Sequence, residues 1–205
     1  MQHDFILLDR SGSMGDLWAE AISSVNAYVK KLAEDKVDTG VTLAVFDSSG
    51  GVSTFDILRD RIIPSTWRPV TEGEAPPRGM TPLNDAIGKI VALAKAGNYD
   101  KVAIIIMTDG HENCSKELTA EQAKKLLDGC RAKNWQVIML GADFNNTVQA
   151  ASYGNLRAST ATMSAGNFMA GTEMLASKRG FYGATGQAVS FSDDEKEALL
   201  KKKAQ

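Results

Sequence analysis

Short apolar runs recur along this chain, and three of them end at or beside an aspartate. These three are Phe5–Leu8 before Asp9, Val41–Phe46 before Asp47, and Val102–Met107, which Thr108 and Asp109 follow. Apolar runs of this length that stop at small polar residues are typical of buried strands. We predict strands over these ranges, and three more over Val52–Leu58, over Trp135–Leu140 and near Arg157–Thr162.

Between these runs, apolar residues recur at spacings of three and four, which is the period of an amphipathic helix. The clearest stripe consists of Trp18, Ile22, Val25, Val29 and Leu32. Start signals are Asp16 and Ser164 as caps and two capping boxes, Thr119 with Gln122 and Ser192 with Glu195. We predict helices over about 17–34, 83–96, 119–132, 146–152, 165–179 and 193–203.

The alternation of strands and helices predicts an α/β fold with a doubly wound, mostly parallel central sheet and helices on both faces. Ser48–Gly51 is short enough to join two antiparallel neighbours, so Val52–Leu58 should form an antiparallel strand at one edge. The proline- and glycine-rich stretch 59–79 is expected to be a long surface connection. We expect one domain over 1–180, with a loop over 180–186, and a C-terminal appendage over 181–205 that carries a short charged helix.

Three segments place oxygen-bearing side chains at the edge where the parallel strands should end. They are Asp9-x-Ser11-x-Ser13 after the first strand, Thr81 at a helix start, and Asp109-Gly110 after the strand over 102–107. Ligands bind at this edge in open α/β sheets. Hydroxyl and carboxylate oxygens are hard donors of the type that Mg²⁺ prefers. Each segment alone also fits turn or helix-cap chemistry, and Thr81 in particular could simply cap its helix.

Taken together and in this order, the three segments resemble the von Willebrand factor A domain with its metal-ion-dependent adhesion site. The resemblance covers roughly residues 3–179. It implies that Ser11, Ser13 and Thr81 contact a metal ion through their hydroxyls. It also implies that Asp9 and Asp109 act through bound water or by orienting those hydroxyls.

The same resemblance implies a function as a metal-dependent protein-binding module. The ion would be Mg²⁺, with Mn²⁺ as the alternative, and a partner protein would supply an Asp or Glu carboxylate to it. Because neutral hydroxyls leave the ion under-neutralised, it can accept such an anionic oxygen from outside. We expect the loops 9–15, 78–82 and 109–115 to become ordered when the metal binds.

Charge and composition narrow the choice of partners. The 205 residues carry a formal net charge of −2 and no stripe of Lys and Arg, which argues against nucleic acid or an anionic membrane as the partner. The N-terminus lacks the features of a signal peptide, so we expect a cytoplasmic protein. Of the two cysteines, Cys130 should be buried on a helix, and Cys114 lies in a loop near the candidate site.

An enzymatic role is the main alternative, and we expect none. A metal-assisted hydrolase or phosphotransferase could use Asp9 and Asp109, but phospho-aspartate phosphatases carry a second Asp where this chain has Ser11. A P-loop and a Gly-x-Gly-x-x-Gly fingerprint are also missing, and there are only two histidines. A third possibility is a purely structural metal, with partners docking on 59–79 or on the tail.

One histidine and two arginines lie close in sequence to the candidate site. His111 follows the Asp109-Gly110 pair and is expected to be an exposed loop histidine, with a role in partner choice as the alternative. Arg10 and Arg78 are expected to be solvated, with attraction of an acidic partner as the alternative.

Overall fold

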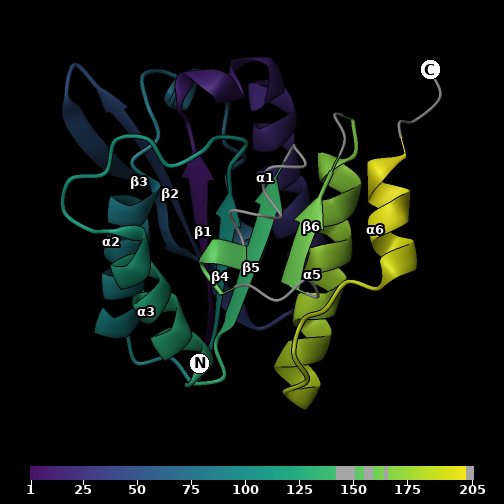
Figure 1. Ribbon diagram of the computed structural model, residues 1–205. Coiled ribbons are helices and arrows are strands. Elements are labelled where there is room, and N and C mark those ends of the chain that lie inside the picture. The colour runs from purple at the N-terminus through teal and green to yellow at the C-terminus, as the bar shows by residue number, and fades with distance from the viewer. Residues whose placement is uncertain (142–150, 155–158, 164–165, 202–205) are drawn as a thin grey trace.

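A computed structural model describes residues 1–141, 151–154, 159–163 and 166–201, and Figure 1 shows its elements around one central sheet. The strands are β1 (Gln2–Asp9), β2 (Thr39–Ser49), β3 (Val52–Ile62), β4 (Lys101–Met107), β5 (Gln136–Gly141) and β6 (Thr160–Thr162). The α-helices are α1 (Trp18–Glu34), α2 (Leu83–Ala96), α3 (Ala120–Arg131), α5 (Phe168–Thr185) and α6 (Asp193–Leu200). Short 3₁₀ helices are η1 (Gly12–Leu17), η2 (Pro64–Thr66) and η3 (Glu72–Glu74).

The sheet has the strand order β3-β2-β1-β4-β5-β6. Every neighbouring pair is parallel except β2 with β3, which are antiparallel. The predicted fold class, including the antiparallel strand at one edge, is therefore confirmed. The hairpin turns at Gly50 and Gly51, both with positive φ, which a glycine adopts without strain.

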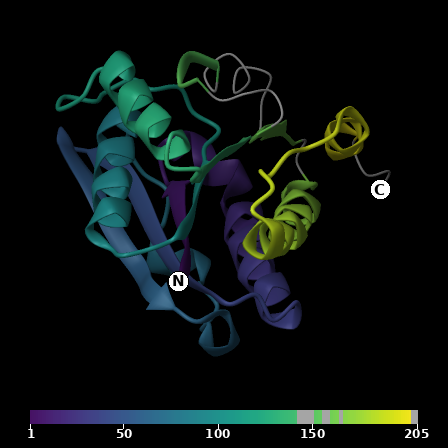
Figure 2. The same cartoon turned by 90° about the horizontal axis from the view of Figure 1, so that it is seen from below.

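Helices cover both faces of the sheet, with α2 and α3 on one side and α1 and α5 on the other (Figure 2). Alternate residues of β1 point to opposite faces, as a strand requires. Phe5 and Leu7 pack against α2 and α3, whereas Ile6 and Leu8 pack against α1 and α5. Because both faces are buried, the second half of β1, Phe5–Leu8, is continuously apolar up to Asp9, where the polar loop begins.

Several predicted element boundaries need correction. Asp16 does not cap α1, because η1 precedes the helix and Leu17 occupies the N-cap position without a side-chain hydrogen bond. Ser164 lies outside the described residues, and the N-cap of α5 is Asn167. Most of the predicted helix 146–152 also lies outside them, and β6 contains only the last part of the predicted strand near 157–162.

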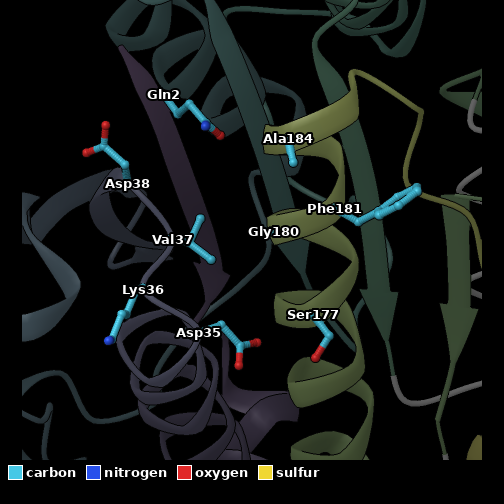
Figure 3. Close-up of a pocket in the computed structure, with 10 residues that line it drawn as sticks. Gln2, Asp35, Lys36, Val37, Asp38, Ser177, Gly180, Phe181 and Ala184 are labelled. Carbon is cyan, nitrogen blue, oxygen red and sulfur yellow. The ribbon is translucent and has the colours of Figure 1, made fainter.

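The expected loop over 180–186 is wrong, because α5 continues to Thr185 and ends at Gly186 in the left-handed conformation. Gly180 and Gly183 lie within this helix, where they allow it to pack closely. A Cβ on Gly180 would lie 3.2 Å from Val37, and one on Gly183 would lie 2.6 Å from Gln2. Figure 3 shows the groove of about 550 Å³ between this part of α5 and the segment that follows α1.

The C-terminal segment packs against the rest of the chain. Val189, Phe191 and Leu199 are buried in the hydrophobic core that α1 and α5 share. The predicted capping box of α6 is confirmed, since Ser192 accepts a hydrogen bond from Glu195 N and Glu195 accepts one from Ser192 N.

The connection after β3 is also less open than its composition suggests. The strand continues to Ile62, and the segment beyond it buries Val70 and Ala75. Arg59 forms an ion pair with Glu74 at 2.8 Å, which ties the segment back to the strand. In the described part of the chain, no helix is both long enough and apolar enough to cross a membrane.

Candidate metal site

The candidate site begins where the neighbouring strands β1 and β4 end. Leu8 lies opposite Met107 in the parallel ladder, so Asp9 and Thr108 follow on adjacent strands. The Asp9 side chain is fully buried, and both of its oxygens accept hydrogen bonds. Oδ1 accepts from Ser11 N at 2.7 Å, and Oδ2 accepts from Thr108 Oγ1 at 2.6 Å. Asp9 thus fixes the start of its own loop and joins it to the end of β4.

The two serine hydroxyls continue this chain of contacts. Ser11 Oγ and Ser13 Oγ are 3.1 Å apart, and Ser13 Oγ donates to Asp109 Oδ1 at 2.9 Å. Ser11 is buried and Ser13 is exposed, so the series of oxygens leads from the interior to the surface. The segment after β1 is therefore in contact with the segment after β4 through side chains 96 residues apart.

Thr81 reaches the site from the segment before α2. The N-cap residue of α2 is Pro82, so the expectation that Thr81 might only cap this helix is not met. Its backbone is tied to the loop after β4, because Thr81 N donates to Asn113 Oδ1 at 2.9 Å and Asn113 N donates to Thr81 O at 3.2 Å. The Thr81 side chain is buried, as expected for a residue that faces the molecule rather than solvent.

Gly110 marks the point at which the three segments converge. A Cβ at this position would lie 2.9 Å from Thr81 Oγ1, 3.3 Å from Ser13 Oγ and 3.4 Å from Asp9 Oδ2. The space beside Gly110 is therefore surrounded by three side-chain oxygens, two from the segment at the end of β1 and one from the segment before α2. The structure thus brings Asp9, Ser13 and Thr81 together around Gly110, and it brings Ser11 and Asp109 into the same hydrogen-bonded group.

The electrostatics of this group favour a cation. Burial raises the pKa of Asp9 to about 6, although hydrogen bonds from Thr108 and Ser11 lower it, and the charge of Asp109 adds to the increase. Each of these carboxylates makes the charge of the other more costly, and a cation close to both would relieve that cost.

The donor set fits a hard divalent ion. It contains three hydroxyls and two carboxylates, and all of its ligating atoms are oxygens, which suits Mg²⁺. No group of three or more His, Cys, Asp or Glu side chains that could hold a metal occurs among the described residues.

Sequence reasoning did not identify two residues that hold the site together. Thr108 joins β4 to Asp9, as described above, and Glu112 organises the loop after Asp109. The Glu112 carboxylate accepts from Ser115 N at 2.7 Å and from Asn84 N at 2.8 Å, so it connects this loop to the start of α2. Glu112 lies beside Asp109-Gly110 in the sequence, but the backbone N–H groups that donate to its carboxylate are evident only from the fold.

The charged residues near the site are only partly as expected. His111 is exposed, in agreement with the sequence analysis. Arg10 is not solvated: its side chain is buried and forms an ion pair with Asp47 at 2.8 Å. Arg78 is half exposed, and its Nε donates to the same carboxylate at 2.8 Å.

The cysteines do not extend the site. Cys130 is fully buried, as predicted, and Cys114 is half-buried. Burial raises the pKa of the Cys114 thiol, which makes the thiol less reactive.

The chain was compared with protein-family models, with curated sequences and with solved structures. The family model of the von Willebrand factor type A domain matches residues 5–176. No curated protein sequence matches this chain. Several solved structures share the fold at low sequence identity.

The vWF domain of the type V pili tip protein Mfa5 from Porphyromonas gingivalis has a TM-score of 0.65 and 12% identity, over 94% of this chain and 97% of that one. The SpRpn10 VWA domain has a TM-score of 0.58 and 12% identity, over 85% of this chain and 95% of that one. The pilus adhesin SpaC from Lactobacillus rhamnosus GG, in its open conformation, has a TM-score of 0.65 and 12% identity, but the match covers 88% of this chain and only 30% of that one. At these identities the structures show a common fold.

Proposed function

This chain belongs to the von Willebrand factor type A domain family, and we propose that it is a metal-dependent protein-binding module. Domains of this family are in general protein-interaction modules. In our proposal, Ser11, Ser13 and Thr81 hold a Mg²⁺ ion through their hydroxyls, while Asp9 and Asp109 orient these groups and balance the charge. Together the five residues would form a metal-ion-dependent adhesion site.

The observation that carries the proposal is the convergence of oxygen atoms at Gly110. Thr81 Oγ1, Ser13 Oγ and Asp9 Oδ2 all lie within 3.4 Å of the position that a Cβ on this residue would occupy. Buried polar groups in proteins normally have at least one hydrogen-bond partner. An arrangement in which a glycine keeps the space between three oxygens open is better explained by a ligand than by packing.

The proposed ion would supply an electrophilic centre for an anionic oxygen from a partner. The chain itself would contribute the neutral hydroxyls that leave this centre under-neutralised, and it keeps the Asp9 carboxylate away from the surface. Asp9 is buried, and its oxygens are already occupied by Ser11 N and Thr108 Oγ1. A carboxylate from a partner protein, from Asp or Glu, is the ligand that such a centre accepts best.

A titration with Mg²⁺ and Mn²⁺ tests the metal site. We expect the wild-type chain to bind either ion and the Thr81→Ala variant to bind about tenfold more weakly or not at all. Thr66→Ala is the matched control, because Thr66 is exposed and its hydroxyl donates to Ile63 O at 2.9 Å rather than to a residue of the site. Equal affinities in Thr81→Ala and wild type would contradict the proposal.

Access of a carboxylate to the ion can be measured separately with Mn²⁺ as the probe. Acetate should displace water from the protein-bound Mn²⁺ and lower the water-proton relaxation rate, whereas acetamide, which is uncharged, should have little effect. If acetate has no effect although Mn²⁺ is bound, the metal is structural and the partner must dock elsewhere, for example on residues 59–79 or on the C-terminal segment.

Catalysis remains the alternative function, and the surroundings of Asp9 argue against it. A nucleophilic carboxylate must reach its substrate, but the Asp9 side chain is fully buried and accepts a hydrogen bond on each oxygen. Release of phosphate from simple phosphomonoesters in the presence of Mg²⁺ tests this. Turnover that the Asp9→Asn variant abolishes would overturn the binding-module proposal.

A further inference from the structure

We propose that Asp47 is a positioning residue that sets the spacing between the two segments carrying Ser11 and Thr81. This inference rests on the proposed metal function. Asp47 follows the apolar part of β2, and its side chain is completely buried. Asp47 is not one of the proposed metal-site residues.

The Asp47 carboxylate is shared by one arginine from each segment. Arg10 Nε donates to Oδ1 at 2.9 Å, and Arg78 Nε donates to Oδ2 at 2.8 Å. Thr54 on the neighbouring strand β3 also donates to Oδ1. Because Arg10 directly precedes Ser11 and Arg78 lies three residues before Thr81, one carboxylate holds both ligand-bearing segments.

Backbone hydrogen bonds connect the same two segments at the same place. Arg78 N donates to Arg10 O at 2.8 Å, and Gly12 N donates to Gly79 O at 3.0 Å. The Arg78–Met80 stretch is also pressed against the end of β2, since a Cβ on Gly79 would lie 2.0 Å from Ser48 O. The side-chain pairs therefore reinforce a close approach that the backbone already makes.

The cost of burying charged groups explains why Asp47 and the two arginines stay paired. A buried arginine is tolerated only when its charge is paired, and Arg10 is paired with both Asp47 and Asp56. Burial alone would raise the pKa of Asp47, but hydrogen bonds from Thr54, Arg78 and Arg10, together with the charge of Arg10, keep it below its usual value. Asp47 thus remains charged and continues to hold both guanidinium groups.

Because Arg78 is positively charged, the direction of the change in metal affinity on its removal distinguishes two explanations of its role. If Arg78 acted only through its charge, removing that charge would strengthen the binding of a cation nearby. If Arg78 acts through Asp47 to fix the segment that carries Thr81, removing it weakens metal binding instead. The two explanations therefore predict changes in affinity of opposite direction.

The Arg78→Gln variant tests the inference. It is preferable to Asp47→Asn, because that variant would leave the buried Arg10 paired only with Asp56, which is partly exposed. We expect Arg78→Gln to bind Mg²⁺ about tenfold more weakly than wild type, in titrations at low and at moderate salt. Arg61→Gln is the matched control: it removes the same charge from an exposed residue on β3, where Arg61 pairs with Asp60. It should bind Mg²⁺ as wild type does.

Hydrogen exchange in EDTA provides a second readout that does not depend on the metal. The Gly12 amide, which donates to Gly79 O, should exchange at least about tenfold faster in Arg78→Gln than in wild type or Arg61→Gln. Equal or stronger Mg²⁺ binding by Arg78→Gln would overturn the inference. If the wild type binds no metal, the proposed function fails, and the Gly12 exchange rate alone decides: an unchanged rate overturns the positioning role, and a faster one supports it.

Discussion

At the scale of single residues, Gly110 offers the most direct test of the site. Alanine there would place a methyl group 2.9 Å from Thr81 Oγ1 and 3.3 Å from Ser13 Oγ, within the space between the oxygens. We expect Gly110→Ala to weaken Mg²⁺ binding by about tenfold or more while the chain still folds. Gly129→Ala on α3, where a Cβ would meet nothing within 4 Å, should keep metal affinity and raise stability by about 0.5–1 kcal/mol. Similar metal affinities in both variants would show that the space at Gly110 holds no ion.

A second prediction at this scale concerns pH and the buried His3. Its side chain is 1% exposed, its Nε2 lies 2.9 Å from Thr42 Oγ1, and burial lowers its pKa from 6.5 to about 4. Because the unfolded chain takes up the proton first, the free energy of unfolding should fall as the pH drops below 6.5, by about 2 kcal/mol at pH 5. Below pH 4 the folded chain is protonated as well, and the loss stops growing.

Denaturant unfolding in EDTA between pH 7.5 and 5 measures this loss. His3→Gln removes the titrating group, so its free energy of unfolding should depend less on pH than that of the wild type. His111→Gln replaces the exposed histidine and should follow the wild-type profile. Identical acid profiles for His3→Gln and wild type would refute the prediction.

At the scale of elements, the sequence predicts those strands, helices and helix caps that are determined by local residue patterns. The strand predicted over 102–107, which is Lys101–Met107 in the structure, and the capping box at Thr119 and Gln122 are confirmed, because hydrophobic period and cap chemistry are local properties. The extent of α5 was not predictable in this way. Gly180 and Gly183 look like helix breakers in the sequence, but they lie inside α5 where it packs closely: a Cβ would lie 3.2 Å from Val37 on Gly180 and 2.6 Å from Gln2 on Gly183. Close packing of this kind is a tertiary contact that the local sequence pattern does not reveal.

The docking of α6 leads to a prediction at the same scale. Leu199 is 2% exposed in the core, while the neighbouring Leu200 is 44% exposed. Asn167 reinforces the contact, since its Nδ2 donates to Leu199 O at 2.8 Å. We expect Leu199→Ala to lower the free energy of unfolding by about 2–3 kcal/mol and Leu200→Ala by less than about 0.5 kcal/mol, measured by denaturant unfolding. Equal and small effects would mean that the C-terminal segment is an independent appendage.

At the scale of the whole molecule, the sequence predicts which residues approach one another but not how they are held. The three segments could be assigned to one edge of the sheet because parallel strands end at the same side. Arg10 was expected to be solvated, since nothing in its neighbourhood in the sequence reveals a buried aspartate. Its partner Asp47 lies 37 residues away and Asp56 lies 46 residues away, on a hairpin whose register only the fold defines. Long-range ion pairs of this kind have no local signature in a single sequence.

The coupling between metal and fold is the prediction that involves the whole molecule. The proposed ion binds residues from segments that are far apart in the chain, so it should bind the folded state and not the unfolded one. At a free metal concentration one hundred times the dissociation constant, linkage adds about 2.7 kcal/mol to the free energy of unfolding. For a domain of this size, the melting temperature should rise by about 5–10 °C.

Thermal unfolding in EDTA, in Mg²⁺ and in Mn²⁺ measures this coupling, with Asp109→Ala as the variant that loses it. Asp109 accepts a hydrogen bond from Ser13 Oγ and so links the segment after β4 to the segment after β1. Amides in the loops 9–15, 78–82 and 109–115 should become more protected from exchange when metal is added to the wild type. A melting temperature that rises equally in Asp109→Ala would place the ion elsewhere on the molecule. Since the shift requires all three segments to act together, it tests their assembly into one site rather than the contribution of any single ligand.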